Sequence, residues 1–268
     1  MDTTDQTAGL VAASRDRTKA AGVTIGASVI AVLLIVWWVI TDLTGLVKPL
    51  YFPAPSEVAA ALGQVWSSLW SDGVATLLRV LGSWALGSAI GVLVGLLMVR
   101  SRLLFYALTP IIEALRPVPP IALIPFVILW FGIGNSGKIF LGALACFMVM
   151  VVNTIVSAGN VAPVYGRAAR SLGAGEAQVY RTVILPAIVP ELVSGLRIGS
   201  ALAFAVIVAA EFLGAEHGIG RLIMQASRTL NTPVVLIGTI IIALEAVLVD
   251  RAISTVSARL TSWADTNN

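Results

Sequence analysis

The chain has 268 residues, of which 58% are hydrophobic and only 12% are charged, and its formal net charge is +3. A soluble domain usually carries about twice that charged fraction, and several apolar runs here are long enough to cross a bilayer. The composition therefore excludes an ordinary soluble protein and predicts an all-α integral membrane protein. The single cysteine, Cys146, excludes an intrachain disulfide, and the single histidine, His217, excludes a multi-histidine metal site.

The N-terminal part combines a polar tail with one apolar run. Residues 1–21 are rich in Thr and Asp and end in basic residues, so we expect a disordered cytoplasmic tail and not a signal peptide. Residues 22–42 predict the first membrane helix, with Trp37 and Trp38 near an interface. This run is too long for a cleaved signal, and we expect it to remain as an anchor.

A more polar stretch and a long apolar run follow. In residues 43–73, Ser56 is a candidate cap for a helix that begins near Glu57, and we expect this helix to lie on the external surface. Residues 74–99 predict the second membrane helix. Small residues recur at every fourth position of that helix, at Ser83, Gly87, Gly91 and Gly95. Such a face allows close helix packing, either within the chain or at the seam of a dimer.

Prolines interrupt the third apolar region, residues 104–131. Pro110 lies inside it, and the run Arg116-Pro117-Val118-Pro119-Pro120 follows. Because proline lacks an N–H and clashes with the preceding turn, we expect a kinked or unwound segment. Such a segment is tolerated at membrane depth only where protein or water satisfies the backbone. Residues 132–138 predict a turn, and residues 139–159 predict the fourth helix.

The longest polar interruption after the N-terminal third covers residues 166–187. It predicts two short helical pieces around a break at Gly173-Ala174-Gly175. Residues 188–213 predict the fifth membrane helix and residues 233–250 the sixth. Between them, residues 214–232 predict a short re-entrant or surface helix.

The distribution of Lys and Arg predicts the orientation of these six spans. With the N-terminus inside, the inner segments carry ten basic residues and the outer segments five. By the positive-inside rule, we expect both termini and the loop at 164–187 on the cytoplasmic side of the membrane. The transmembrane domain then covers residues 22–260, and a cytoplasmic tail follows at 261–268.

Ionisable residues within the apolar runs are candidates for transport, because each costs about 2.5–3.5 kcal/mol at the centre of a bilayer. Glu113 and Arg116 are three positions apart, which allows either a structural pair or the lining of a substrate path. Arg79 is placed either to attract an anion or to reach the membrane interface. Glu211 is a further candidate for the path.

Motifs for catalysis are absent from the sequence. Gly132 to Lys138 matches the start of a phosphate-binding loop, but Ile139 stands where Ser or Thr would bind magnesium. The chain has no His/Cys cluster and no GxSxG, so an intramembrane enzyme would lack its chemistry. We expect no cofactor on this chain. A stand-alone secondary transporter stays open as an alternative, although no convincing inverted repeat is present.

Residues 50–250 resemble the permease subunits of ATP-binding-cassette importers, in the branch that serves nitrate, sulfonate, taurine and bicarbonate. The stretches that carry the resemblance are Phe52 to Val58, Leu115 to Ala122, Trp130 to Gly134, Ala210 to Phe212, Gly218 to Gly220 and the polar loop. In the loop, the family pattern is Glu-Ala-Ala, three residues, Gly, nine residues and Ile-x-Leu-Pro. The spacing matches, and Arg167 stands in place of the usual Glu.

The resemblance implies a type I importer-like permease of six transmembrane helices in a bacterial plasma membrane, whose polar loop is the coupling helix. It also implies a second copy of the chain, or a paralogous permease, together with two ATPases that hold ATP and magnesium, an external binding protein and no nucleic acid. The residues implied in ATPase coupling are Arg167, Ala168, Ala169, Leu172, Gly173, Ala174, Glu176, Leu185 and Pro186. The residues expected in the translocation path or gate are Arg79, Glu113, Arg116, Pro117, Pro119, Pro120 and Glu211. We expect a small anionic substrate, with an aromatic carboxylate, a vitamin or a pyrimidine precursor as alternatives.

Overall fold

The structure is a computed structural model that describes residues 24–260. Every regular element in this range is helical, which confirms the expected all-α class. Five helices are long and apolar enough to cross a membrane, or six if the bent third region counts as one span. The expected tails, residues 1–21 and 261–268, lie outside the described residues.

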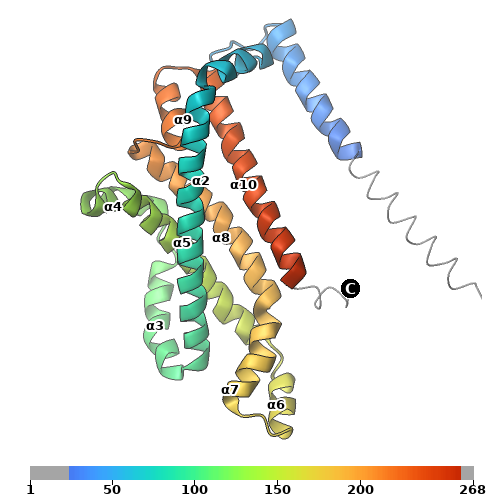
Figure 1. The fold of residues 1–268 in the computed structure, drawn as a ribbon, viewed down its shortest axis with the longest axis vertical. Helices are drawn as coiled ribbons and strands as arrows, with labels where there is room; N and C mark the ends of the chain where they lie inside the picture. Colours follow the sequence, from blue (N-terminus) through green and yellow to red (C-terminus); the bar gives the residue numbers. More distant parts are fainter. Residues whose placement is uncertain (1–23, 261–268) are drawn as a thin grey trace, which may run out of the picture.

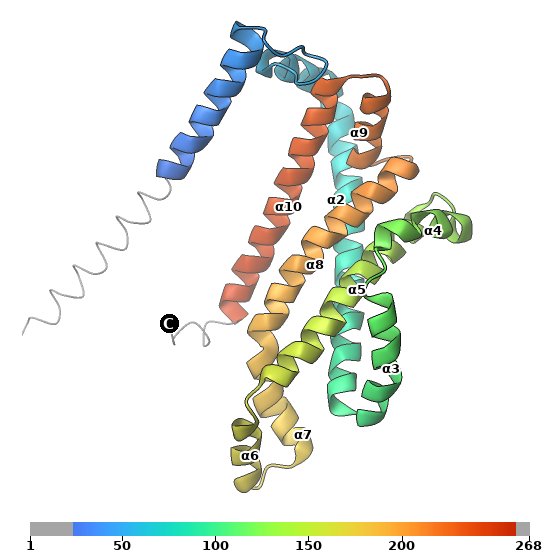
Figure 2. The same ribbon diagram turned by 180° about the vertical axis from the view of Figure 1, so that it is seen from behind.

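The first apolar helix, Thr24–Leu43, stands apart from the other helices (Figures 1 and 2). Only 6% of its most apolar window is buried, and its last turn is the π-helical η1, Val39–Leu43. The Trp37 Nε1 donates a hydrogen bond to the Pro53 carbonyl oxygen at 3.0 Å, and the Trp37 ring lies 5.6 Å from that of Phe52. These contacts tie the end of the helix to the linker that follows.

A single helix, α2 (Pro55–Arg100), replaces the separate surface helix and membrane helix that we expected. The predicted boundary near residue 74 is wrong: no proline follows Pro55 within the helix, and Leu69, Asp72 and Gly73 are buried against neighbouring elements, which favours helix despite the weak propensity of these residues. The predicted cap is wrong as well. Pro55 opens the helix, where its missing N–H costs nothing, and the Ser56 Oγ donates to Asp42 Oδ1 at 2.5 Å.

The third apolar region is broken, as the prolines predict. It comprises α3 (Arg102–Leu115), the 3-10 helix η2 (Pro120–Leu123) and α4 (Ile124–Phe131). The axes before and after the break differ by 82°. The turn predicted at residues 132–138 is shorter than expected, since α5 (Asn135–Asn160) begins inside it.

The polar loop folds into two short helical pieces, as expected. These are α6 (Pro163–Ser171) and α7 (Glu176–Val179), and Gly173 between them has a φ of +87°. The π-helical η3 (Tyr180–Ile184) and α8 (Leu185–Leu213) then continue as one long helical span. Figures 1 and 2 show α6 and α7 projecting beyond the other helices, at what we call the loop end of the bundle.

The opposite end of the bundle holds α9 (Ile219–Arg228), which packs against α2, α8 and α10 (Thr232–Leu260). We call it the α9 end. The short helix expected in residues 214–232 is therefore present, and it is packed against its neighbours.

The helices α2 and α5 pack most closely, and the small residues of α2 explain why. A Cβ added at Gly87 would overlap the backbone of Ala143. One added at Gly91 would lie 2.8 Å from Met150 Cβ, and one at Gly95 would lie 2.7 Å from Thr154 Cβ. The small face of α2 thus packs within the chain, which favours the first of the two alternatives considered above.

Candidate translocation and coupling sites

A cavity of about 430 Å³ lies where the third region bends, between the bend, α5 and α8. Its lining includes Arg116, Val118 and Pro120 from the bend and Asn153 from α5. A smaller cavity of about 180 Å³ against α3 is lined by both Glu113 and Arg116. The bend therefore brings several of the predicted path residues to one place in the fold.

Glu113 and Arg116 do not form the structural pair that their spacing allows. Within residues 24–260, no ion pair joins them, and both side chains are exposed in this single chain. Pro117 and Pro119 are exposed beside them. The guanidinium of Arg116 is thus free to meet a ligand.

The chemistry of this cavity suits an anion. A guanidinium presents a planar fork of donors that matches the oxygens of a carboxylate or sulfonate, and the Asn153 amide offers both a donor and an acceptor. Sequence reasoning missed Asn153. Its signal was an amide side chain in the middle of an apolar run, where a polar group needs a partner.

Arg79 and Glu211 lie at the α9 end, and there they pair with each other. Their side chains are 8% and 0% exposed, and Arg79 Nη1 lies 2.5 Å from Glu211 Oε1. Arg79 also donates from Nε to Asn135 Oδ1 at 2.8 Å and from Nη1 to the His217 carbonyl oxygen at 2.7 Å. The charge of Arg79 is therefore compensated inside the protein.

Further polar groups complete this arrangement. Thr76 Oγ1 lies 3.0 Å from Glu211 Oε2 and accepts from the Ile219 N–H at 2.9 Å, while the Gly220 N–H donates to Glu211 Oε2 at 2.9 Å. Asp72 accepts from the Gly218 N–H at 2.8 Å and from Arg221 Nη2 at 3.1 Å. We call this group the polar cluster; its side chains are Asp72, Thr76, Arg79, Asn135, Glu211 and Arg221.

The polar cluster ties the start of α9 to α2 and α8. Sequence reasoning identified Arg79 and Glu211 but not Asp72, Thr76 or Asn135. Asp72, Thr76 and Arg79 are spaced by four and three residues, so they lie on one face of α2. That spacing was the available signal.

The coupling residues expected from the loop lie together at the tip and base of α6 and α7. Leu172 at the tip is 89% exposed, and Arg167 and Ala168 are also exposed. The chain closes behind Leu172 through hydrogen bonds from the Gly173 N–H to the Arg170 carbonyl oxygen (2.9 Å) and from the Ala174 N–H to that of Ala169 (3.0 Å). A helix end that presents an apolar residue to solvent is a candidate for docking into another protein.

The base of the loop is held more loosely. Arg170 Nη1 and Glu176 Oε1 are 3.2 Å apart, and their side chains are 47% and 71% exposed. Leu185 and Pro186 open α8, so the far end of the expected coupling segment continues directly into a membrane span.

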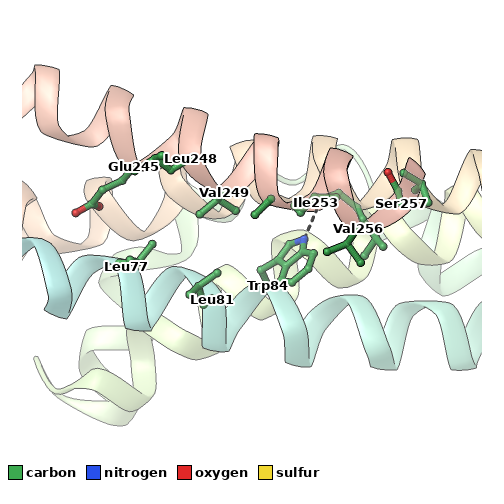
Figure 3. A pocket seen from close by; sticks show the side chains of 12 residues that line it. Leu77, Leu81, Trp84, Glu245, Leu248, Val249, Ile253, Val256 and Ser257 are labelled. Atoms are coloured by element: carbon green, nitrogen blue, oxygen red, sulfur yellow. Dashed lines mark hydrogen bonds between the residues drawn. The ribbon is translucent and has the colours of Figure 1, made fainter. Parts of the chain in front are cut away.

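An apolar groove of about 440 Å³ runs between α2, α8 and α10 (Figure 3). Its lining includes Leu81 and Val249, and the Trp84 Nε1 donates to the Leu196 carbonyl oxygen at 2.9 Å. Glu245 stands at one end, and its Oε2 is buried without a hydrogen-bond partner among the described residues. The groove offers little to orient a polar solute, so we do not place the path there.

No group of three or more His, Cys, Asp or Glu side chains that would hold a metal ion occurs within residues 24–260.

Comparison with known proteins gives consistent matches. Residues 87–262 match the sequence profile of a family described as "Binding-protein-dependent transport system inner membrane component". The chain is 39% identical over 248 residues to the taurine transport system permease protein TauC of Escherichia coli (strain K12). The matched region covers 90% of this chain and 90% of that protein.

Two other relatives are more distant. The putative aliphatic sulfonates transport permease protein SsuC of Bacillus subtilis (strain 168) is 31% identical and covers 87% of this chain and 85% of its own. The riboflavin transport system permease protein RibX of Chloroflexus aurantiacus is 31% identical and covers 82% and 83%. Among solved structures, an inward-facing conformation of the MetNI methionine ABC transporter matches with a TM-score of 0.56, at 22% identity, over 71% of this chain and 98% of that chain.

Proposed function

Because this chain belongs to the family of binding-protein-dependent transport system inner membrane components, we propose that it lines a solute path at the bend and receives the ATP-driven motion at the loop end. The chain is the membrane permease subunit of an ATP-driven importer and is not itself an enzyme. ATP and magnesium belong to a separate ATPase chain. The function expected from the sequence, that of an importer permease subunit, is thus confirmed.

The proposed assembly contains two permease chains, two cytoplasmic ATPase subunits and one external binding protein. The observation that best supports docking of an ATPase is the exposed tip of the loop. Leu172 is 89% exposed at the end of α6, on a segment that projects beyond all membrane helices. A partner that covered Leu172 would remove its apolar surface from water.

The proposed transmission starts at this tip. Closure of the ATPase dimer would move α6 and α7, with Arg167, Ala168, Ala169 and Leu172 in contact with the partner. Gly173 and Ala174 form the turn that presents the tip. Since the span from Glu176 to Leu213 is one continuous helix, motion at Glu176, Leu185 and Pro186 would tilt α8 as a unit.

The proposed path runs past the bend. Pro117 and Pro119 interrupt the helical backbone there and Pro120 opens η2, while Arg116 and Asn153 offer donors to an anion in the cavity. Glu113 lines the adjacent smaller cavity. Arg79 and Glu211 would act as a fixed part of the gate at the α9 end, because their charges are already paired.

A small sulfonate is the substrate that best fits both the cavity and the relatives. The names of two relatives specify taurine and aliphatic sulfonates. A vitamin-like solute is the second candidate, since one relative is a riboflavin permease. We propose that the loop end and both termini face the cytoplasm of a bacterial cell, in agreement with the distribution of basic residues.

Co-purification tests the proposal. The chain, solubilised from its native membranes in mild detergent, is expected to carry an ATPase subunit in roughly equal amount. Leu172→Asp should abolish this association by placing a charge in the docked apolar contact. Leu46→Asp is the matched control, because Leu46 is 78% exposed in the linker before α2. Equal ATPase recovery in all three proteins, or none in the wild type, would contradict the proposal.

A further inference from the structure

Another cavity lies behind the loop, between the loop and the ends of two membrane helices. It has a volume of about 330 Å³ and is bounded by the last residues of α2 and α5, by α6 and by α7 with η3. Within the described residues, its lining includes three arginines, Arg100, Arg167 and Arg170, but only one carboxylate, that of Glu176.

The charges in this cavity do not balance. Glu176 is engaged by Arg170 at 3.2 Å. In the described part of the chain, neither Arg100 nor Arg167 forms an ion pair. Two guanidinium groups from different elements, α2 and α6, therefore face one cavity in which the described residues give neither of them an ion-pair partner.

The rest of the lining is suited to the boundary between water and lipid. Val99, Val161 and Val183 contribute apolar surface. The Tyr180 hydroxyl donates to the Leu96 carbonyl oxygen at 2.9 Å, which holds this wall against α2. Guanidinium groups bind phosphate oxygens through paired N–H donors, and basic pockets at the ends of membrane helices take anionic headgroups.

We propose that this cavity binds a phosphate group, with Arg100 and Arg167 as its ligands. The phosphate is either that of an anionic lipid headgroup, such as phosphatidylglycerol, or inorganic phosphate from solution. A phosphate held between α2 and α6 links the loop to a membrane span, so its occupancy sets how stiffly the two move together. Binding in detergent does not depend on the proposed orientation or on an ATPase, so its failure would leave the proposed function untouched.

The lipid arm of the test uses the purified full chain, stripped of lipid and offered equal amounts of phosphatidylglycerol and phosphatidylcholine. Native mass spectrometry counts the bound lipids. The wild type should retain phosphatidylglycerol preferentially, and Arg100→Gln should lower that retention about fivefold, the effect of one basic residue near an anionic surface. Arg102→Gln is the matched control, since Arg102 is exposed, lies two residues away and is not part of the lining. Thermal unfolding without lipid verifies that both variants fold.

The second arm measures thermal stabilisation of the same proteins by inorganic phosphate against chloride at equal ionic strength. Lipid selectivity that is lost in Arg100→Gln and kept in Arg102→Gln assigns the site to a headgroup. Stabilisation by phosphate with the same variant pattern, without lipid selectivity, assigns it to free phosphate. The site would be overturned if the wild type showed neither effect, or if both variants lost the effect equally.

Discussion

At the α9 end of the bundle, the Glu211 side chain is 0% exposed and accepts hydrogen bonds from Arg79, Thr76 and Gly220. At the loop end, Leu172 is 89% exposed, and the Arg170–Glu176 pair is open to solvent. At the α9 end, the polar groups form hydrogen bonds and ion pairs within the chain. The other end leaves its surface uncovered.

This difference separates two tasks that an importer subunit must combine. Removing one partner of a buried ion pair strongly lowers the stability of a protein, because the other charge stays buried and unpaired. Such pairs therefore hold neighbouring helices in one arrangement. Exposed pairs contribute little to stability, and they leave a segment free to follow a partner. We therefore propose that the helices at the α9 end stay in one arrangement during transport, and we call this the fixed end. The loop end would move with the ATPase, and we call it the driven end.

The largest expected effect comes from breaking the fixed end. Glu211→Ala leaves the Arg79 charge buried without a partner and should lower the free energy of unfolding by about 3–5 kcal/mol. Thermal unfolding in detergent, followed by size-exclusion chromatography, measures the loss. The double variant Arg79→Leu with Glu211→Leu should regain part of that stability. A double variant less stable than Glu211→Ala would show that the charges themselves are required.

Two glycines compare the ends directly. Gly218 has a φ of +136°, and an added Cβ would overlap the Glu211 carboxylate, whereas Gly173 has a φ of +87° and open space around it. Gly218→Ala should cost about 3 kcal/mol, and Gly173→Ala only about 1 kcal/mol of backbone strain. Both are measured by the same unfolding assay. Equal costs would mean that the α9 end is no more crowded than the loop.

Between the two ends, Arg116 tests the path without disturbing either. Arg116→Gln removes a charged donor from the bend cavity and should lower uptake of a sulfonate about tenfold, the effect of one charged hydrogen bond. Stability should not change, because within residues 24–260 Arg116 has no ion-pair partner. Uptake in cells and thermal unfolding of the purified variant are compared. Unchanged uptake would remove Arg116 from the path.

The smallest effect is expected from the exposed pair at the loop end. Glu176→Gln should change the free energy of unfolding by no more than about 0–1 kcal/mol, because solvent screens the Arg170–Glu176 interaction. The same thermal assay serves here, with Glu211→Ala as the reference for a buried pair. A loss as large as that of Glu211→Ala would abolish the contrast between the ends.

The sequence predicted those features that depend on local signals. Apolar runs located the spans, Pro117 to Pro120 located the break, and Gly173 located the turn of the loop. The sequence did not predict helix boundaries that depend on packing against other parts of the chain. The continuity of α2 through residue 74 was missed because an amphipathic segment followed by an apolar one does not require a break.

The partners of buried charges were also beyond local reasoning. Glu211 was recognised as unusual, but Arg79, its partner, lies 132 residues earlier in the chain. Likewise, Asn153 lines the bend cavity only because α5 packs next to the proline-rich bend. A single sequence records which side chains need partners, whereas the packing of the helices determines which partners they find.

Crosslinking is the most direct test of the claim that the loop end is the driven end. With Cys146 replaced by Ser, a single cysteine is placed at Leu172 or, at the opposite end, at Leu46, and a thiol-to-amine crosslinker is applied to native membranes. If the loop end docks onto the ATPase, position 172 forms a crosslinked product with an ATPase subunit at a yield that depends on ATP, and position 46 forms none. A product from position 46 alone, or from neither position while the ATPase is present, would contradict this claim.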